Sequence, residues 1–305
     1  MLLPQSNRSI VVSLTVLLLC GVLILFMSIK KYGAWFSAHA YGNMTMHAKY
    51  HRLYNIYDVT YSIGNQSSSN DQQVVDYIRS QILQPSLTRP LNLARPNKTD
   101  QSLVGESALV DKLLPGRRNG FFVECGAADG ETQSNSLFFE RYRNWTGLLI
   151  EGNPVWHGAL LNKNRRAYVL KTCLGTERRP TVVRFRNHQF QSGIVGKIHG
   201  SLRGRVFKVQ CFPMNYVMEA LGVSHIDYLS LDVEGPELEI LHTVNWSRLH
   251  VDVMTIEYRT KSIKATLKKL NDLRQFFHDT GIYHEIGVLP SGDETKGLDV
   301  VFSRV

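Results

Sequence analysis

Five short apolar runs follow one another between residues 121 and 258, and stretches with helical patterning separate them. Buried parallel strands have this near-continuous apolar character, because helices cover both faces of such a sheet. The alternation therefore predicts an α/β domain with a mostly parallel sheet. The runs are FFVEC (121–125), GLLIEG (147–152), AYVLKTC (167–173), IDYLSLD (226–232) and VDVMTIEY (251–258).

The C-terminal end of the chain adds one helix and two further strands. Apolar residues at helical spacing over 263–280 predict an amphipathic helix that ends before Gly281. Strands over 283–288 and 298–303 flank a loop with Ser291, Gly292 and Asp293, which is typical of an antiparallel hairpin. We expect this hairpin at the sheet edge.

A second hairpin interrupts the alternation. Residues 181–190 and 204–212 both alternate polar and apolar positions around the loop QSGIVGKIHGSLRG. The hairpin is basic, so it could cover an acidic substrate or face an anionic lipid or glycan, or it could be a solvated surface arm.

The N-terminal part has a membrane-protein pattern. Residues 10–29 (IVVSLTVLLLCGVLILFMSI) form an uncharged run of twenty, the length that a transmembrane helix needs. The rival interpretation is a cleavable signal peptide, since Ala38-His39-Ala40 resembles a cleavage site. We expect a short cytosolic tail (1–9), a signal-anchor helix (10–29), a stem (30–105) and a folded domain (106–305). Within the stem, apolar spacing over 71–84 predicts a short helix that docks on the domain.

Two signals disagree on the orientation of the anchor. Lys30 and Lys31 directly follow the apolar run and favour a cytosolic C-terminal side. Five N-x-S/T triplets after the anchor favour the lumen, where glycosylation takes place, and we give them more weight. The triplets begin at Asn43, Asn65, Asn97, Asn144 and Asn245.

The cysteines fit either compartment. Cys20 lies in the apolar run, which leaves three cysteines in the folded part. A Cys173–Cys211 bridge with Cys125 reduced is the preferred arrangement, and three buried thiols in a reducing compartment is the alternative.

The loop after the first predicted strand is the strongest local signal for a ligand site. VECGAADGET (123–132) ends a strand in Glu124 and passes through Gly126 and Gly130 toward a helix expected near Glu131. The glycines permit a tight turn and a close approach of the backbone to a ligand. Because Glu124 and Asp129 make the spot negative, it repels phosphate and favours a cationic ligand such as the amino group and sulfonium of S-adenosylmethionine.

A second carboxylate lies in register with this loop. Glu151 ends the next apolar run, twenty-five residues after Gly126. Folds of this kind place an acidic residue at similar spacing to bind ribose hydroxyls. Glu151 is therefore a candidate cofactor ligand, with an exposed structural carboxylate as the alternative.

A third acidic group is expected at the same sheet edge. LSLDVEGPELEIL (229–241) delivers Asp232 and Glu234 to the carboxyl end of a buried strand, where ligands bind in open α/β sheets. Asp232 and Glu234 are the catalytic candidates, with Asp232 orienting or deprotonating an acceptor hydroxyl, and Glu237 and Glu257 rank behind them. A metal site from Asp232, Glu234 and Glu257 is conceivable, but no histidine lies at ligand spacing, so we predict none.

These motifs together resemble the FkbM-type methyltransferases. The matching segments are VECGAADGETQSN, NWTGLLIEGNP, VQCFP and, most specific of all, SLDVEGPELEILHT, within 103–305. The resemblance implies a Rossmann-like methyltransferase fold, S-adenosylmethionine as cofactor and methylation of a hydroxyl or similar oxygen. It implies cofactor roles for Glu124, Gly126, Asp129, Gly130 and Glu151. Ala128 stands where the family has asparagine, which puts that contact in doubt.

Within the family, the motifs are most similar to the branch that contains the membrane protein Star. This similarity implies a single-pass glycoprotein of the endoplasmic reticulum, Golgi or endosome that acts in vesicle-mediated export or sorting of growth-factor precursors. Two hypotheses follow: a lumenal methyltransferase, or a trafficking factor that binds secretory cargo through the same fold. The net charge of +9 alone is weak evidence for an anionic partner, and no recognition motif points to nucleic acid.

Overall fold

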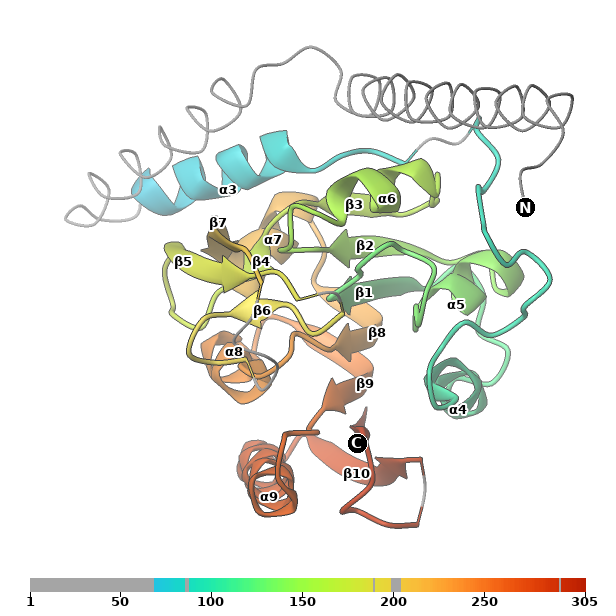
Figure 1. Ribbon diagram of the computed structural model, residues 1–305, viewed down its shortest axis with the longest axis vertical. Coiled ribbons are helices and arrows are strands. Elements are labelled where there is room, and N and C mark those ends of the chain that lie inside the picture. The colour runs from blue at the N-terminus through green and yellow to red at the C-terminus, as the bar shows by residue number, and fades with distance from the viewer. Residues whose placement is uncertain (1–68, 86–87, 189, 199–203, 291) are drawn as a thin grey trace, which may run out of the picture. The chain divides into compact units, whose positions relative to one another are not determined.

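The computed structural model describes residues 69–85, 88–188, 190–198, 204–290 and 292–305 (Figure 1). The predicted anchor (10–29) and most of the predicted stem lie outside these residues. In the described residues, no helix combines the length and the apolar character needed to cross a bilayer.

A seven-stranded sheet carries the domain. Its order is β10-β11-β9-β8-β1-β2-β3, and every strand is parallel to its neighbours except β11, which runs antiparallel to both β9 and β10. The predicted parallel sheet and its antiparallel C-terminal hairpin are confirmed. The strands are β1 (Phe121–Cys125), β2 (Thr146–Ile150), β3 (Tyr168–Leu170), β8 (His225–Leu231), β9 (His250–Glu257), β10 (Tyr283–Leu289) and β11 (Asp299–Arg304).

Helices cover both faces of this sheet (Figure 1). One apolar cluster joins a sheet face to α3 (Ser69–Gln81), α7 (Met214–Leu221), α8 (Glu237–Thr243) and α9 (Ile263–Thr280). The other cluster joins the opposite face to α4 (Glu106–Leu113), α5 (Leu137–Tyr142) and α6 (His157–Asn162). With both faces covered, the strands bury almost every side chain, which explains their unbroken apolar sequence.

The helix of the stem packs on the domain as expected. Val75 and Ile78 of α3 are buried in the first cluster, and Leu83 forms an isolated antiparallel bridge with Val169. The described part of the stem is thus a component of the folded unit.

A second sheet of four strands, ordered β4-β7-β5-β6, contains the predicted second hairpin. It consists of β4 (Cys173–Leu174), β5 (Thr181–Arg186), β6 (Gly193–Ile194) and β7 (Val206–Phe212). The expected Cys173–Cys211 disulfide joins β4 to β7, and Cys125 is buried and reduced.

Two predicted elements differ from the structure. The run 167–173 is two strands in two sheets, because the disulfide and a hydrogen bond from Thr172 Oγ1 to the Gln210 carbonyl hold its second half on β7. The helix expected near Glu131 begins only at Leu137. The backbone N–H groups of Glu131 and Thr132 instead donate to Asp129 in a turn.

Candidate active site

A crevice opens at the carboxyl ends of β1, β2 and β8. It encloses about 90 Å³, and its volume is about 870 Å³ when the solvent at its mouth is included. Five of the seven predicted site residues line it: Glu124, Gly126, Glu151, Asp232 and Glu234. These residues converge at one edge of the sheet, because parallel strands bring their carboxyl ends together.

Gly126 lets the ends of β1 and β8 approach each other. Its φ is +86°, and a Cβ atom there would lie 1.8 Å from the backbone oxygen of Asp232. Backbone hydrogen bonds hold this turn to the two neighbouring strands. Gly126 N donates to Ile150 O of β2 at 3.0 Å, and Asp232 N, just after β8, donates to Cys125 O at 3.2 Å. Only glycine fits this left-handed, crowded position.

Glu124 lines the crevice, but its carboxylate is already engaged by the protein. It is 4% exposed and accepts hydrogen bonds from Ser134 Oγ, from Asn135 N and from Ser136 Oγ. Arg165 lies behind these groups and donates to both serine hydroxyls and to Glu140. Glu124 therefore organises the loop after β1, a role that local sequence did not reveal.

Asp129 and Gly130 lie outside the crevice lining. The Asp129 carboxylate accepts from Glu131 N at 2.9 Å and from Thr132 N at 2.7 Å, so it closes the turn. A Cβ atom on Gly130 would lie 2.5 Å from the Leu160 side chain. Glycine at this position therefore lets the loop pack closely against Leu160. A cofactor role for these two residues stays a prediction.

Glu151 lies at the end of β2, facing the loop after β1. Its carboxylate accepts from Ala128 N at 2.7 Å and from Asn153 N at 2.5 Å. Burial raises the pKa of Glu151 to about 7; the two backbone hydrogen bonds lower it and the charge of Asp232 raises it further. Ala128 has a φ of +45°, a conformation that asparagine adopts more readily than alanine. This accounts physically for the asparagine that the resemblance implies there.

The acceptor side of the crevice is acidic. Asp232 is exposed to the solvent of the crevice, whereas Glu234 and Glu257 are half-buried, and one carboxylate oxygen from each lies within 4.8 Å of the others. Although its side chain faces the opening of the crevice, the surrounding protein partly desolvates the Asp232 carboxylate, and this desolvation, followed by the charge of Glu237, raises its pKa to about 7. Burial and then Asp232 and Glu237 raise the pKa of Glu234 to about 8.

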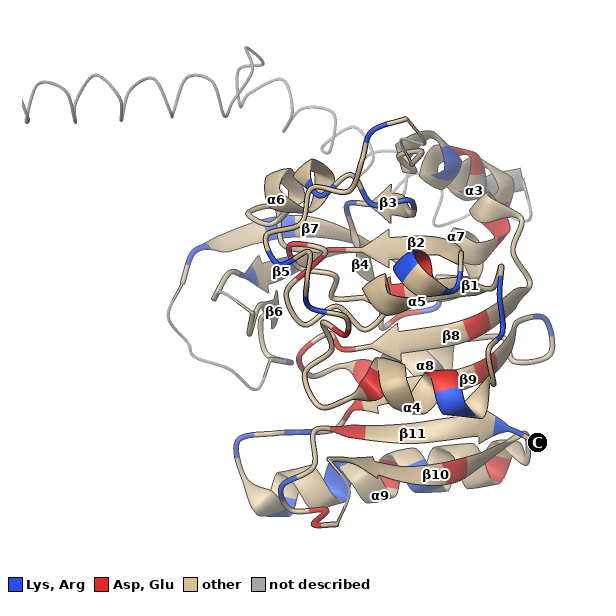
Figure 2. Cartoon of the chain, turned by 90° about the vertical axis from the view of Figure 1, so that its right-hand side faces the viewer, with Lys and Arg blue, Asp and Glu red and all other residues tan. Residues whose placement is uncertain are grey.

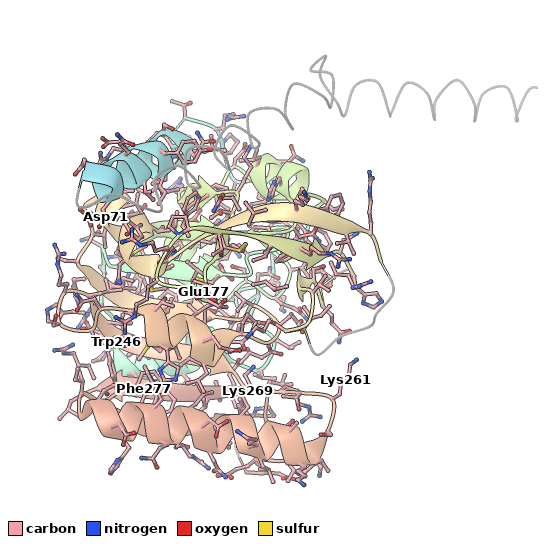
Figure 3. The ribbon with its side chains drawn as sticks, turned by 90° about the vertical axis from the view of Figure 1, so that its left-hand side faces the viewer. Asp71, Glu177, Trp246, Lys261, Lys269 and Phe277 are labelled. Carbon is pink, nitrogen blue, oxygen red and sulfur yellow. A yellow bond between two sulfur atoms is a disulfide. The ribbon has the colours of Figure 1, made fainter. Side chains whose placement is uncertain are left out.

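One buried carboxylate shapes the loop that carries Glu234. Glu237 accepts from Val233 N at 3.1 Å and from Gly235 N at 3.0 Å. Lys269 of α9, labelled in Figure 3, pairs with Glu237 at 2.5 Å. Within the described residues, Glu257 Oε2 is buried and has no hydrogen-bond partner. Asp232, Glu234 and Glu257 could together hold a divalent cation through oxygen ligands. The expectation of no metal site remains untested.

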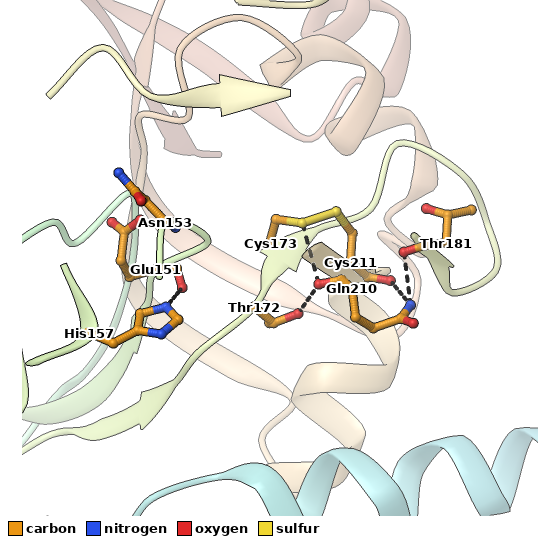
Figure 4. Close-up of a disulfide and its surroundings, with 8 residues drawn as sticks. All are labelled: Glu151, Asn153, His157, Thr172, Cys173, Thr181, Gln210 and Cys211. Carbon is orange, nitrogen blue, oxygen red and sulfur yellow. Dashed lines mark hydrogen bonds between the residues drawn. A yellow bond between two sulfur atoms is a disulfide. The ribbon is translucent and has the colours of Figure 1, made fainter. Parts of the chain in front are cut away.

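The second sheet forms the remaining wall of the crevice. Phe185, Phe190 and Ile194 line it, and the Phe190 ring stacks on Trp156 with centroids 5.0 Å apart. Cys173 of the disulfide also lines the crevice, and Figure 4 shows the disulfide together with Glu151 and Asn153. The sequence indicated a hairpin that could cover a substrate, but not that these apolar side chains and the disulfide line the crevice, because only the tertiary fold brings them to the site.

The raised pKa of Glu234 predicts that unfolding depends on pH. Its pKa is about 8 in the folded protein and about 4.3 in an unfolded chain. The folded state therefore binds more protons, and this group's contribution to stability is present below about pH 4 and is lost as the pH rises to about 8. We expect Glu234→Gln to raise the melting temperature at pH 9, with no increase at pH 4. Calorimetry at both pH values, in the presence of a chelator, measures this difference.

Glu177→Gln, at an exposed position, is the control for this measurement. An equal effect of Glu234→Gln on the melting temperature at both pH values would contradict the raised pKa of Glu234.

Fold and site together define an α/β methyltransferase-like domain. The family model described as methyltransferase FkbM domain matches residues 124–282, more than half of the chain's 305 residues. The chain therefore belongs to the FkbM methyltransferase family. Family membership implies S-adenosylmethionine as the cofactor.

Solved structures of methyltransferases are similar at low identity. Methyltransferase FkbM from Methylobacillus flagellatus KT is 14% identical with a TM-score of 0.39, covering 60% of this chain and 43% of its own. Precorrin-6y C5,15-methyltransferase from Geobacter metallireducens GS-15 is 12% identical with a TM-score of 0.37, covering 70% and 95%. A TehB-like S-adenosylmethionine-dependent methyltransferase from Corynebacterium glutamicum is 11% identical with a TM-score of 0.35, covering 67% and 89%. This chain thus spans less than half of the FkbM structure. No curated protein matches it.

Proposed function

We propose that this chain is a single-pass membrane protein whose lumenal domain transfers a methyl group from S-adenosylmethionine to a hydroxyl oxygen. One observation carries the enzymatic part of the proposal. One crevice is lined both by a candidate ligand for ribose hydroxyls, Glu151, and by two candidate ligands for an acceptor, Asp232 and Glu234. A donor and an acceptor could therefore meet within it.

The residues present fit the chemistry of the cofactor. Glu151 offers carboxylate oxygens beside the loop after β1, and the acidic acceptor side favours a cationic ligand. The enclosed volume of about 90 Å³ is small beside the roughly 300 Å³ or more of typical ligand pockets. A ligand of this size would occupy the open part of the crevice.

S-adenosylmethionine would supply a methyl group on a positively charged sulfur. Methylation of an acceptor hydroxyl would require the removal of the hydroxyl proton. Asp232, with its pKa near 7, is suited to accept that proton near neutral pH. Alignment of the two reactants supplies most of the remaining rate enhancement.

Two features support a lumenal location: the exposed asparagines of the glycosylation triplets and the disulfide. Asn97, Asn144 and Asn245, the sequon asparagines in the described residues, are all exposed. The Cys173–Cys211 bridge is of the kind that persists in oxidising compartments. We expect endoglycosidase to increase the gel mobility of the full chain, and intact vesicles to protect the domain from protease. Digestion of the domain in intact vesicles would place it in the cytosol.

The small enclosed volume of the crevice favours one alternative function, a trafficking factor similar to Star that binds secretory cargo without catalysis. Isothermal titration of the purified full-length chain with S-adenosylmethionine separates the two. A saturable heat supports the methyltransferase. No detectable binding at millimolar cofactor would overturn it and leave the trafficking function.

A further inference from the structure

The positive charge of the chain is concentrated in the second sheet and its loops. Residues 171–212 contain nine Lys and Arg and one carboxylate, a net charge of +8 out of the chain's +9. We refer to the described part of this segment (171–188, 190–198 and 204–212) as the basic arm. Figure 2 shows basic positions along β5 and β7 of this arm. A surface of this charge attracts polyanions.

Two exposed cations of the basic arm lie side by side. Arg184 of β5 and Lys208 of β7 are exposed and lie directly opposite each other in the antiparallel register. Like charges in this arrangement destabilise a sheet. An anion bound at this place would be attracted by both side chains.

Two cations of the basic arm pair with acidic side chains outside the arm. Arg179 pairs with Asp71 at 3.2 Å and Lys197 pairs with Glu239 at 2.8 Å, and all four side chains are more than 40% exposed. The single carboxylate within the arm is Glu177. Exposed ion pairs of this kind contribute little and are easily exchanged for another anion.

The basic arm also reaches the mouth of the crevice. Asn153, two residues after Glu151, donates through Nδ2 to Asn187 Oδ1 at 2.8 Å and to Ser192 Oγ at 3.0 Å. These hydrogen bonds connect the arm to the site. Phe190 of the arm is 42% exposed while it stacks on Trp156. A ligand bound along the arm would therefore meet aromatic rings and polar groups where the crevice opens.

We propose that the basic arm binds an acidic polysaccharide, with sulfate or carboxylate groups on Arg and Lys, and presents one sugar hydroxyl to the crevice as the methyl acceptor. The inference rests on the proposed methyltransferase function and names its substrate class. Arg and Lys bind such anionic groups through charge-assisted hydrogen bonds. The exposed face of Phe190 at the mouth is a surface on which a sugar ring can pack. A membrane surface, by contrast, would not enter a crevice, and a lumenal domain would not meet nucleic acid.

Binding of the full-length protein to immobilised heparin, without cofactor, tests this proposal. We expect Arg184→Glu/Lys208→Glu to weaken binding at least tenfold at physiological salt and to reduce the dependence of binding on salt. The matched control is Lys112→Glu/Arg118→Glu, which makes the same charge change at exposed positions outside the arm and should change binding less than twofold. Arg184→Gln/Lys208→Gln should give an intermediate loss, and melting temperatures show whether each variant is folded.

Two further probes distinguish the possible polyanions. Vesicles with phosphatidylserine and a homopolymeric RNA should bind more weakly than heparin at equal salt. Equal losses in the arm and control variants would overturn the proposal, as would a preference for vesicles or RNA. Because no cofactor is present, failure of the methyltransferase function would appear in the titration with S-adenosylmethionine and not in this assay.

Discussion

Replacement of Gly126 by alanine is expected to destabilise the domain and to remove the cofactor site. The new Cβ atom would lie 1.8 Å from the Asp232 backbone oxygen, at a φ of +86°. Backbone strain costs about 1–3 kcal/mol, and overpacking costs a similar amount. A combined loss of about 3 kcal/mol or more lowers the melting temperature of a domain of this size by roughly 6–12 °C. Calorimetry measures the shift, and titration with S-adenosylmethionine measures the loss of binding.

Gly222→Ala is the matched control. Gly222 follows α7 with a φ of +71°, and a Cβ atom there would have no neighbour within 4 Å. Gly222→Ala introduces the backbone strain without the steric clash, so it should lower the free energy of unfolding by only about 1 kcal/mol. Cofactor binding should remain intact. Equal destabilisation by the two variants would show that the close approach of β1 and β8 is unimportant.

Replacement of Glu151 by alanine is expected to weaken S-adenosylmethionine binding about 10–100-fold. A hydrogen bond to a charged carboxylate contributes about 1.5–3 kcal/mol, and the proposed site loses its ribose ligand. Glu151→Asp retains the charge on a shorter side chain, so it should lose most of the affinity as well. Isothermal titration of each variant measures the effect.

This experiment must distinguish a disordered loop around Glu151 from the loss of a direct contact between Glu151 and the cofactor. Glu151 also accepts from Ala128 N and Asn153 N, so its removal leaves two N–H groups without their acceptor. Glu177→Ala removes an exposed carboxylate elsewhere and should bind normally. Unchanged affinity in Glu151→Ala would exclude Glu151 as a cofactor ligand, whatever the melting temperature.

Local sequence was most informative where an element depends on its own residues. The strand 121–125 and the helix 263–280 have the predicted bounds, since an unbroken apolar run and a spaced apolar face each determine one element. The loop after β1 was less predictable. Its acidic residues bind the protein's own N–H and hydroxyl groups, and their donors are up to twelve positions away.

Arg165 is the clearest case that sequence reasoning missed. Its side chain is fully buried with Glu140, and it donates to the serines that bind Glu124. No local pattern distinguishes this arginine from an exposed one, because its partners lie 25 to 35 residues away in the sequence. Burial of such a charge is possible only where several distant groups converge.

The sequence by itself determined the order of strands and helices, the glycine turn after β1 and the carboxylates at three strand ends. These features follow from periodicity and backbone freedom, which act over a few residues. Only the tertiary structure decided which carboxylates face the crevice, which ones hold the protein's own backbone, and that the basic arm reaches the mouth of the site. Those outcomes depend on contacts between segments far apart in the chain, where burial and charge act through space.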